Sequence, residues 1–162
     1  MLRSKEIELK SNLDELHKLE EFVEQISDYY NINSTYYSNI LVALTEAVTN
    51  SIVHANKENP DAIVKITFEA KNKALYFTIE DEGQGFDFNN YPDPTNIEIK
   101  DFENIGKGLF LMKSLSDIVE YNEETGTIEL GFKISSINKE LAVSRVKSLQ
   151  SYFATNKTTV KA

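Results

Sequence analysis

One helix-length stretch, Tyr37 to Asn56, contains a single charged side chain, the carboxylate of Glu46. Asn50 and His54 follow Glu46 at successive intervals of four residues. At about 100° per residue, this spacing places the carboxylate, the amide and the imidazole on one stripe of an α-helix. Apolar residues on the other side predict the face that packs on a core: Leu41, Leu44, Val48, Ile52 and Ala55.

The polar stripe of this helix has no Lys or Arg before Lys57, although an ordinary surface helix would carry them. The stripe is therefore expected to face an enclosed space, where a lone carboxylate is costly unless it has a partner or a task. Two interpretations remain open from this segment alone. Glu46 either belongs to a functional site or forms part of a buried polar cluster that anchors the fold.

Two glycine motifs follow: Asp81-Glu82-Gly83-Gln84-Gly85-Phe86-Asp87, after two strand-like runs, and Gly106-Lys107-Gly108-Leu109-Phe110-Leu111-Met112. Neither has the P-loop pattern. The first is a weak signal alone, because Asp and Gly occur in any tight turn. The second is stronger, because glycine allows close backbone approach and the N–H groups at a helix start can hold phosphate. The order of the three motifs indicates a nucleotide site.

With these motifs the chain resembles the Bergerat-fold, histidine-kinase-like ATPases, and within them the bacterial anti-sigma-factor serine/threonine kinases. Residues 46–55 resemble the N box, 81–86 the first glycine box and 106–112 the second. Ser51 and Lys107 stand where the family often has Ala and Arg. The resemblance covers residues 6–132 and implies an α/β two-layer sandwich. The implied sandwich has a mixed, mainly antiparallel sheet with about three helices on one face. An ATP lid is expected between the glycine motifs, at residues 88–105.

The resemblance also implies the role of each motif residue. Glu46 would be the catalytic general base, Asn50 would bind Mg²⁺, and Asp81 would accept a hydrogen bond from the adenine amino group. Thr127 would support Asp81. The other residues implied in ATP binding are His54 in the N box, Gly83 and Gly85 beside the base, and Gly106, Lys107, Gly108 and Leu109 at the phosphates.

Composition fits one compact domain of 162 residues. The net charge of −9 argues against nonspecific nucleic-acid binding, and the absence of Cys excludes a disulfide framework. No apolar stretch approaches transmembrane length and the N-terminus does not resemble a signal peptide, so a cytoplasmic protein away from the membrane is expected. We expect the ATPase domain at residues 1–136 and a C-terminal extension at 137–162, with a helix over 138–153 and a loose tail.

Local patterns predict the remaining elements. A capping box at Ser11 to Asp14 is expected to begin the first helix. Asn31 to Ser34 is expected to supply the cap of the second. Alternating apolar residues predict strands at 6–10, 63–69, 74–80, 118–122 and 127–134.

The acceptor of the phosphate separates the functional hypotheses. The favoured one is a protein serine/threonine kinase and partner-switching regulator that phosphorylates a Ser of an antagonist protein, binds a sigma factor, and forms a homodimer through the first strand and helix. A stand-alone histidine kinase module would need an acceptor His on another chain, since His17 lies in an ordinary helical context and His54 belongs to the N box. A gyrase-type ATPase would need a transducer domain. An ATP-binding regulator without turnover or without a sigma factor is the remaining alternative.

Overall fold

The computed structural model describes residues 2–83, 107–122, 124–134, 147 and 149–154. Five strands form one open sheet in the order β1-β2-β3-β5-β4. Every strand pair in the described part is antiparallel. The strands are β1 (Ser4–Lys10), β2 (Ile63–Lys71), β3 (Ala74–Glu80), β4 (Ile118–Asn122) and β5 (Thr127–Lys133). β1 begins two residues before the strand predicted at 6–10, and the bounds of the other four strands agree with their predictions within two residues.

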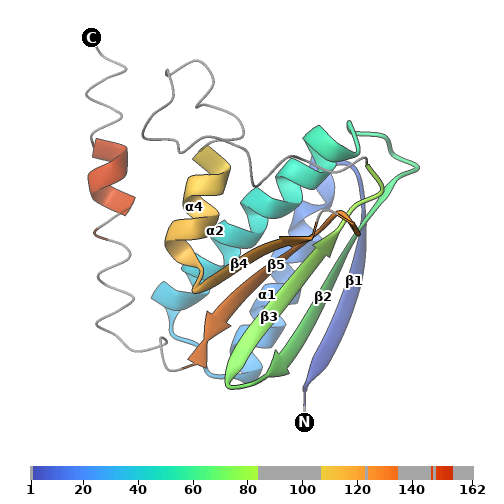
Figure 1. The fold of residues 1–162 in the computed structure, drawn as a ribbon. Helices are drawn as coiled ribbons and strands as arrows, with labels where there is room; N and C mark the ends of the chain where they lie inside the picture. The colour runs from blue at the N-terminus through green and yellow to red at the C-terminus, as the bar shows by residue number, and fades with distance from the viewer. Residues whose placement is uncertain (1, 84–106, 123, 135–146, 148, 155–162) are drawn as a thin grey trace.

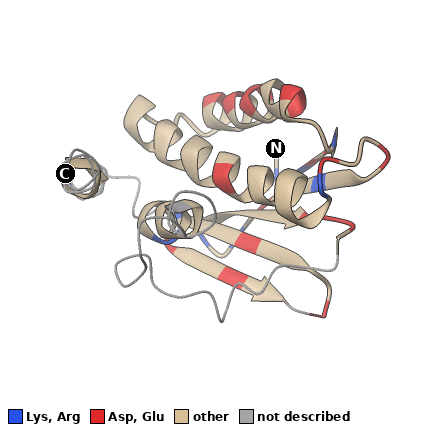
Figure 2. Cartoon of the chain, turned by 90° about the horizontal axis from the view of Figure 1, so that it is seen from above, with Lys and Arg blue, Asp and Glu red and all other residues tan. Residues whose placement is uncertain are grey.

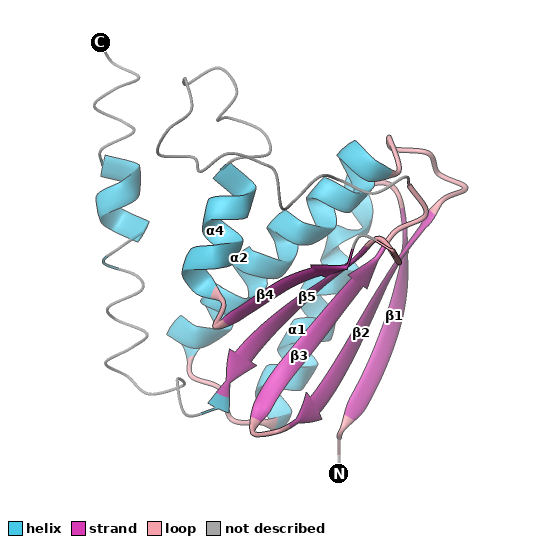
Figure 3. Ribbon diagram, viewed as in Figure 1, coloured by secondary structure: helices cyan, strands magenta, loops and turns pink. Residues whose placement is uncertain are grey.

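The helices lie on one face of this sheet and form the second layer (Figure 1 and Figure 3). They are the short 3-10 turn η1 (Leu13–Glu15), α1 (Leu16–Tyr29), α2 (Ser34–Asn50), its π-helical continuation η2 (Ser51–Ala55) and α4 (Lys107–Leu115). The expected two-layer sandwich is confirmed. In the described part of the chain, no helix is both long and apolar enough to cross a membrane.

Aromatic side chains join the two layers. Phe68 and Phe77 lie opposite each other on β2 and β3, with ring centroids 5.3 Å apart. Phe22 of α1 meets Phe77 edge-on at 6.5 Å, and Tyr36 of α2 meets Phe132 at 6.3 Å. All five rings are at least 98% buried. Burial of each such side chain contributes about 1.5–3 kcal/mol, so this cluster fixes α1 and α2 on the sheet.

The start of the first helix differs from the predicted capping box. Asn12, not Ser11, is the cap, and its side chain accepts a hydrogen bond from the backbone N–H of Asp14. Ser11 is buried instead. Its hydroxyl donates to the carbonyl of Ala62 and accepts a bond from the Asn56 amide. A local pattern could not reveal this, because Ser11 is held by residues far along the chain.

The N-box helix also departs from the simple helical pattern. Asn33 caps α2 by accepting a hydrogen bond from the N–H of Tyr36, as the turn chemistry predicts. After Asn50 the backbone becomes π-helical, and a π turn holds more residues than an α turn. The stripe therefore does not continue at the same angle. Leu44, Val48 and Ile52 form the core face as predicted, but Leu41 is only partly buried and Ala55 lines the pocket described below.

Tight turns join the hairpins at the expected places. Asn72 and Lys73, between β2 and β3, have φ of 52° and 60°, as a two-residue hairpin loop requires. Gly126, before β5, has φ of 67°, which glycine adopts without strain.

The surface of α1 is acidic. It exposes Glu20, Glu21, Glu24 and Asp28, and acidic residues are red in Figure 2. In the C-terminal extension, residues 147 and 149–154 are helical, in line with the predicted helix over 138–153. The boundary after residue 136 remains a prediction.

Candidate functional site

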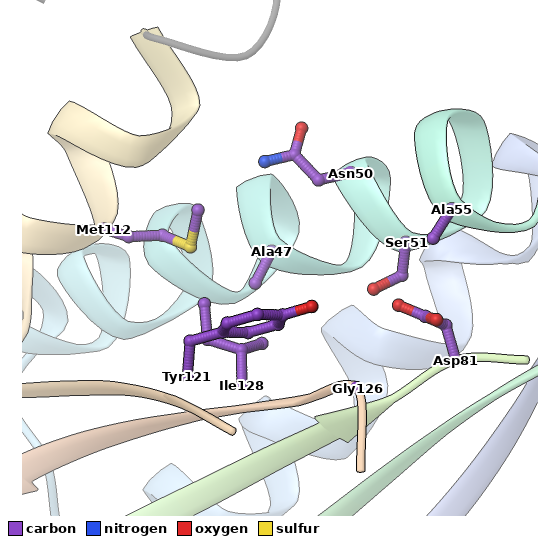
Figure 4. A pocket seen from close by; sticks show the side chains of 9 residues that line it. All are labelled: Ala47, Asn50, Ser51, Ala55, Asp81, Met112, Tyr121, Gly126 and Ile128. Carbon is purple, nitrogen blue, oxygen red and sulfur yellow. The ribbon is translucent and has the colours of Figure 1, made fainter. Parts of the chain in front are cut away.

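A small pocket lies between the N-box helix and one end of the sheet (Figure 4). The cavity measures about 30 Å³, which is room for one or two water molecules. Its described lining comes from α2, η2, α4, β4 and β5, and from the segments that follow β3 and precede β5. The lining residues are Ala47, Asn50, Ser51, Ala55, Asp81, Met112, Tyr121, Gly126 and Ile128. Two predicted site residues, Asn50 and Asp81, therefore share one cavity.

Glu46 and Asn50 meet the start of α4. A Cβ atom built on Gly108 would lie 3.0 Å from Oε2 of Glu46 and 3.3 Å from Nδ2 of Asn50. The missing side chain of Gly108 thus lets the first turn of α4 approach both polar groups. Leu109, Met112 and Leu115 are at least 97% buried and hold α4 on the core in this position. The structure brings three of the predicted residues together here.

The amide of Asn50 is available for a ligand. Its Nδ2 atom is buried and has no hydrogen-bond partner among the described residues. A buried amide group without a partner is uncommon, because desolvation of a polar group costs free energy. This group therefore fits a role in holding a polar ligand next to Glu46 and the helix start.

Asp81 directly follows β3 and forms the acidic end of the pocket. Its Oδ1 accepts a hydrogen bond from the N–H of Gly83 at 3.1 Å. Burial raises the pKa of Asp81 above its usual range, and the hydrogen bonds from Gly83 and from the Ser51 hydroxyl oppose this rise. Figure 4 shows the side chains of Ser51 and Asp81 side by side. A carboxylate in this position can accept a hydrogen bond from a ligand.

Gly83 has a packing role that the motif did not reveal. A Cβ atom there would lie 2.2 Å from the carbonyl oxygen of Ala55, so any larger residue would collide with the backbone of η2. The next contact is made by Asn56, whose Oδ1 accepts a hydrogen bond from the N–H of Glu82 at 3.0 Å. The close packing of Gly83 on Ala55 and the hydrogen bond between Glu82 and Asn56 therefore hold the first glycine motif against the end of the N-box helix, and this positions Asp81.

Two predicted residues lie away from the pocket. His54 is only partly buried and is not among the lining residues, because the π-helical turn follows Asn50. Thr127 lies opposite Glu80, and its hydroxyl is 2.8 Å from that of Thr125. Since Ile128 and Leu130 point to the core, the neighbouring Thr127 points to the other face of the sheet. Its expected support of Asp81 is not seen in this arrangement.

The remaining predicted residues belong to the glycine motifs and the segment between them. Leu109 is 97% buried, so its side chain serves the core, while its backbone lies in the first turn of α4. Lys107 begins α4, and its side chain is not among the described ones. Gly85, Gly106 and the expected lid at 88–105 lie outside the described residues.

Sequence reasoning missed several pocket residues. Ser51 follows Asn50 directly, and only the turn of the helix places its hydroxyl at Asp81. Tyr121 and Ile128 lie opposite each other on β4 and β5 and form the sheet side of the pocket. Strand alternation could have placed them on the helix side, since their neighbours face outward. Nothing in the local pattern links them to Asp81.

Comparison with known proteins agrees with this geometry. The model of the histidine kinase-like ATPase domain matches residues 9–131. The chain belongs to the histidine kinase-like ATPase family. The N box and the core of both glycine motifs lie within the matched region, so the resemblance on which the site was predicted is confirmed at the level of the family.

Among curated members of this family, the chain is 39% identical over 92 residues to the serine-protein kinase RsbW of Staphylococcus aureus strain JH9. It is 37% identical over 91 residues to RsbW of strain MSSA476. In both cases the match covers 52% of this chain and 57% of the relative. The chain thus spans little more than half the length of the curated relatives it matches.

A solved structure shows the same histidine kinase-like ATPase fold. The histidine kinase domain of the Erythrobacter litoralis EL346 blue-light activated histidine kinase aligns with a TM-score of 0.52 at 13% identity. The alignment covers 83% of this chain and 65% of that one. At this identity the likeness concerns the fold alone.

Proposed function

We propose that this chain is an ATP-dependent protein serine/threonine kinase and an anti-sigma factor of the partner-switching type. In this proposal it transfers the γ-phosphate of ATP to a Ser of an antagonist protein and binds a sigma factor. The similarity to the serine-protein kinase RsbW over 92 residues supports the kinase class. The observation that carries the proposal is the meeting of Glu46 and Asn50 at Gly108.

The arrangement suits the binding of ATP. Asp81, at the closed end of the pocket, would accept the hydrogen bond of the adenine amino group, with Ser51 holding its orientation. The N–H groups in the first turn of α4 would face the phosphates, because a helix N-terminus attracts anions. Guanine carries a carbonyl where adenine carries the amino group, and would place an acceptor against the Asp81 carboxylate. The pocket therefore favours ATP over GTP.

The residues at Gly108 fit a magnesium–ATP complex. Asn50 would hold Mg²⁺ through its amide oxygen, and the ion would screen the charge of the phosphates. The buried Nδ2 atom has no hydrogen-bond partner among the described residues, which supports a role of this side chain in binding a ligand. Lys107, at the start of α4, would add a positive charge on the phosphate side.

Glu46 is proposed as the general base. It lies one helical turn before Asn50, and its carboxylate is the nearest atom to the open side of Gly108. From this position it would take the proton of the acceptor hydroxyl as that oxygen attacks the γ-phosphate. A serine hydroxyl is a weak nucleophile, so its acceptance of phosphate depends on such a base.

The stand-alone histidine kinase module has less support. His17 is exposed at the start of α1, and its Nδ1 lies 2.6 Å from the carbonyl oxygen of Asp14, an ordinary local contact. An acceptor histidine would then have to come from a second chain.

The proposal of a serine/threonine kinase also includes assembly of a homodimer through β1 and α1 and a cytoplasmic location.

The role of Glu46 is tested by phosphate transfer. Glu46→Gln keeps the shape of the side chain but cannot accept a proton, so single-turnover transfer should fall about 10²–10⁴-fold. The affinity for Mg-ATP and the melting temperature should stay near those of the wild type. Asn50→Ala should instead weaken Mg-dependent ATP binding. Glu58→Gln, in the exposed loop after η2, is the matched control.

The assay uses ATP labelled at the γ-phosphate and proteins from the native cell that bind the chain in the presence of ATP. Mass spectrometry then identifies the phosphorylated residue. Phosphoserine on a bound protein would support the proposed class, whereas phosphohistidine would indicate the histidine kinase alternative. Transfer that is unchanged in Glu46→Gln would show that Glu46 is an anchor of the fold.

A further inference from the structure

Tyr121 occupies an unusual position in the pocket. Its ring lies below the N-box helix beside Met112 and Ile128, and its hydroxyl points into the space near Ser51 and Asp81 (Figure 4). With the ring in this place, the cavity has only about 30 Å³. A purine base is many times larger than the one or two waters that this volume admits.

Entry of a base therefore requires a lining side chain to move. Met112 and Ile128 are at least 91% buried, and both belong to the core. Ala47, Ala55 and Gly126 have little or no side chain to move. Asn50, Ser51 and Asp81 are the polar groups that a nucleotide would bind. Among the described lining residues this leaves Tyr121, which is both large and only partly buried.

The place of Tyr121 in the sheet leaves room for such a movement. β4 is the last strand of the described sheet and pairs only with β5. The wider hollow of about 600 Å³ that includes Asn122, Glu124 and Thr127 lies on the other face of the sheet, so the space that could receive the ring is the edge beside β4. Tyr121 packs against the core from this edge, and a rotation of its side chain toward the strand edge would move the ring out of the pocket.

We propose that Tyr121 is the gate of the base pocket: its ring fills the adenine position in the closed state and must swing toward the sheet edge before a nucleotide binds. The proposal rests on the proposed ATP-binding function. A gate of this kind lowers the apparent affinity by the fraction of molecules that are open, and it slows association. Tyr121 thus sets how readily the chain exchanges ADP for ATP.

Tyr121→Val tests the gate, because it removes the ring and introduces a β-branched residue that suits a strand. If the open state is populated about one tenth of the time, the variant should bind ADP about tenfold more tightly by calorimetry. The association rate, measured by surface plasmon resonance, should rise in proportion. Tyr121→Phe retains the ring and should behave like the wild type.

Tyr76→Val is the matched control. Tyr76 lies on β3 and packs over Gly131 and beneath Lys71, and it does not line the pocket. This variant should leave both the affinity and the association rate unchanged. Melting temperatures of all variants show whether they fold, and Tyr121→Leu replaces the valine variant if that one does not.

The outcomes separate the gate from the function on which it rests. The gate alone would be overturned if the wild type binds ADP and a folded Tyr121→Val or Tyr121→Leu protein binds it with equal or lower affinity. Such a loss would mean that the ring is a wall on which the base rests. If neither the wild type nor the folded variant binds ADP or ATP, both the gate and the proposed function are wrong. Tighter and faster binding in the variant alone supports the gate.

Discussion

Two glycines of the nucleotide motifs should respond in opposite ways to the same substitution. In Gly108→Ala, the new methyl group would lie 3.0 Å from the Glu46 carboxylate and 3.3 Å from the Asn50 amide. Both are ends of side chains that can shift by a few tenths of an ångström. Alanine is also the better helix former, by up to about 1 kcal/mol. The folded state should therefore lose no stability.

The site should nevertheless be damaged in Gly108→Ala. The methyl group fills the space where the helix start meets Glu46 and Asn50, and it pushes both away from a bound phosphate. Misplacement by about 1 Å can cost about 100-fold in rate. We expect Mg-ATP affinity and phosphate transfer to fall by about 10- to 100-fold, while the melting temperature stays at or above the wild-type value.

Gly83→Ala is the matched comparison. Its methyl group would lie 2.2 Å from the Ala55 carbonyl oxygen, which belongs to the backbone and cannot rotate away. Overpacking of this kind costs about 1–3 kcal/mol. For a chain of this size the melting temperature should fall by about 2–12 °C. Circular dichroism gives the melting temperatures, and calorimetry gives the Mg-ATP affinities.

This reasoning would be refuted by either of two results. Wild-type Mg-ATP affinity in Gly108→Ala would show that the close approach at α4 is not needed for binding. A larger loss of stability in Gly108→Ala than in Gly83→Ala would show that Glu46 and Asn50 are packed rigidly and that the movable contact was misjudged.

Three further predictions concern Asp81 and the C-terminal helix. Asp81→Asn replaces one acceptor oxygen of the carboxylate by an NH2 donor that faces the adenine amino group, and should weaken ATP binding by about 1–3 kcal/mol, or about 5- to 150-fold. Equal ATP and GTP affinities of the wild type in calorimetry would contradict the assignment. Because burial raises the pKa of Asp81, the folded state holds this proton more tightly than the unfolded state, and the ionised carboxylate costs stability as the pH rises through the folded-state pKa. Asp81→Asn should therefore raise the melting temperature more at about pH 8 than at about pH 4, close to the ordinary pKa of an aspartic acid, and the opposite trend would show that the ionised form is stabilised. Tyr152 stacks on Phe110 with ring centroids 4.1 Å apart. A double-mutant cycle with Tyr152→Ala and Phe110→Ala should therefore give a coupling free energy of about 0.5–1.5 kcal/mol in urea unfolding. If the two losses of unfolding free energy simply add, the C-terminal helix does not pack on α4 through these rings.

The strands were predictable because their information is local. β3 and β4 lie where alternating apolar residues place them, at 74–80 and 118–122. The Asn33 cap and the apolar face of Leu44, Val48 and Ile52 follow for the same reason. The choice between Ser11 and Asn12 as a cap was not predictable, because Ser11 is hydrogen-bonded by Ala62 and Asn56, which are far along the chain.

For the candidate site, too, some features could be predicted from local sequence patterns and others could not. The order of the motifs was enough to predict the family and to nominate Glu46, Asn50, Asp81 and Gly108 as site residues. Residues spaced by four on one helix must share a stripe, whatever the rest of the chain does. Such local periodicity persists as long as the backbone remains α-helical.

Which of the nominated residues lie together depends on packing between segments that are distant in the chain. The π-helical turn after Asn50 leaves His54 outside the pocket lining, and the register of β5 turns Thr127 to the far face. Packing between distant segments brings Ser51 to Asp81, Ala55 onto Gly83, and the ring of Tyr121 into the base pocket. These contacts could not be predicted from the spacing of neighbouring residues, because they depend on strand register and on the close approach of separate elements.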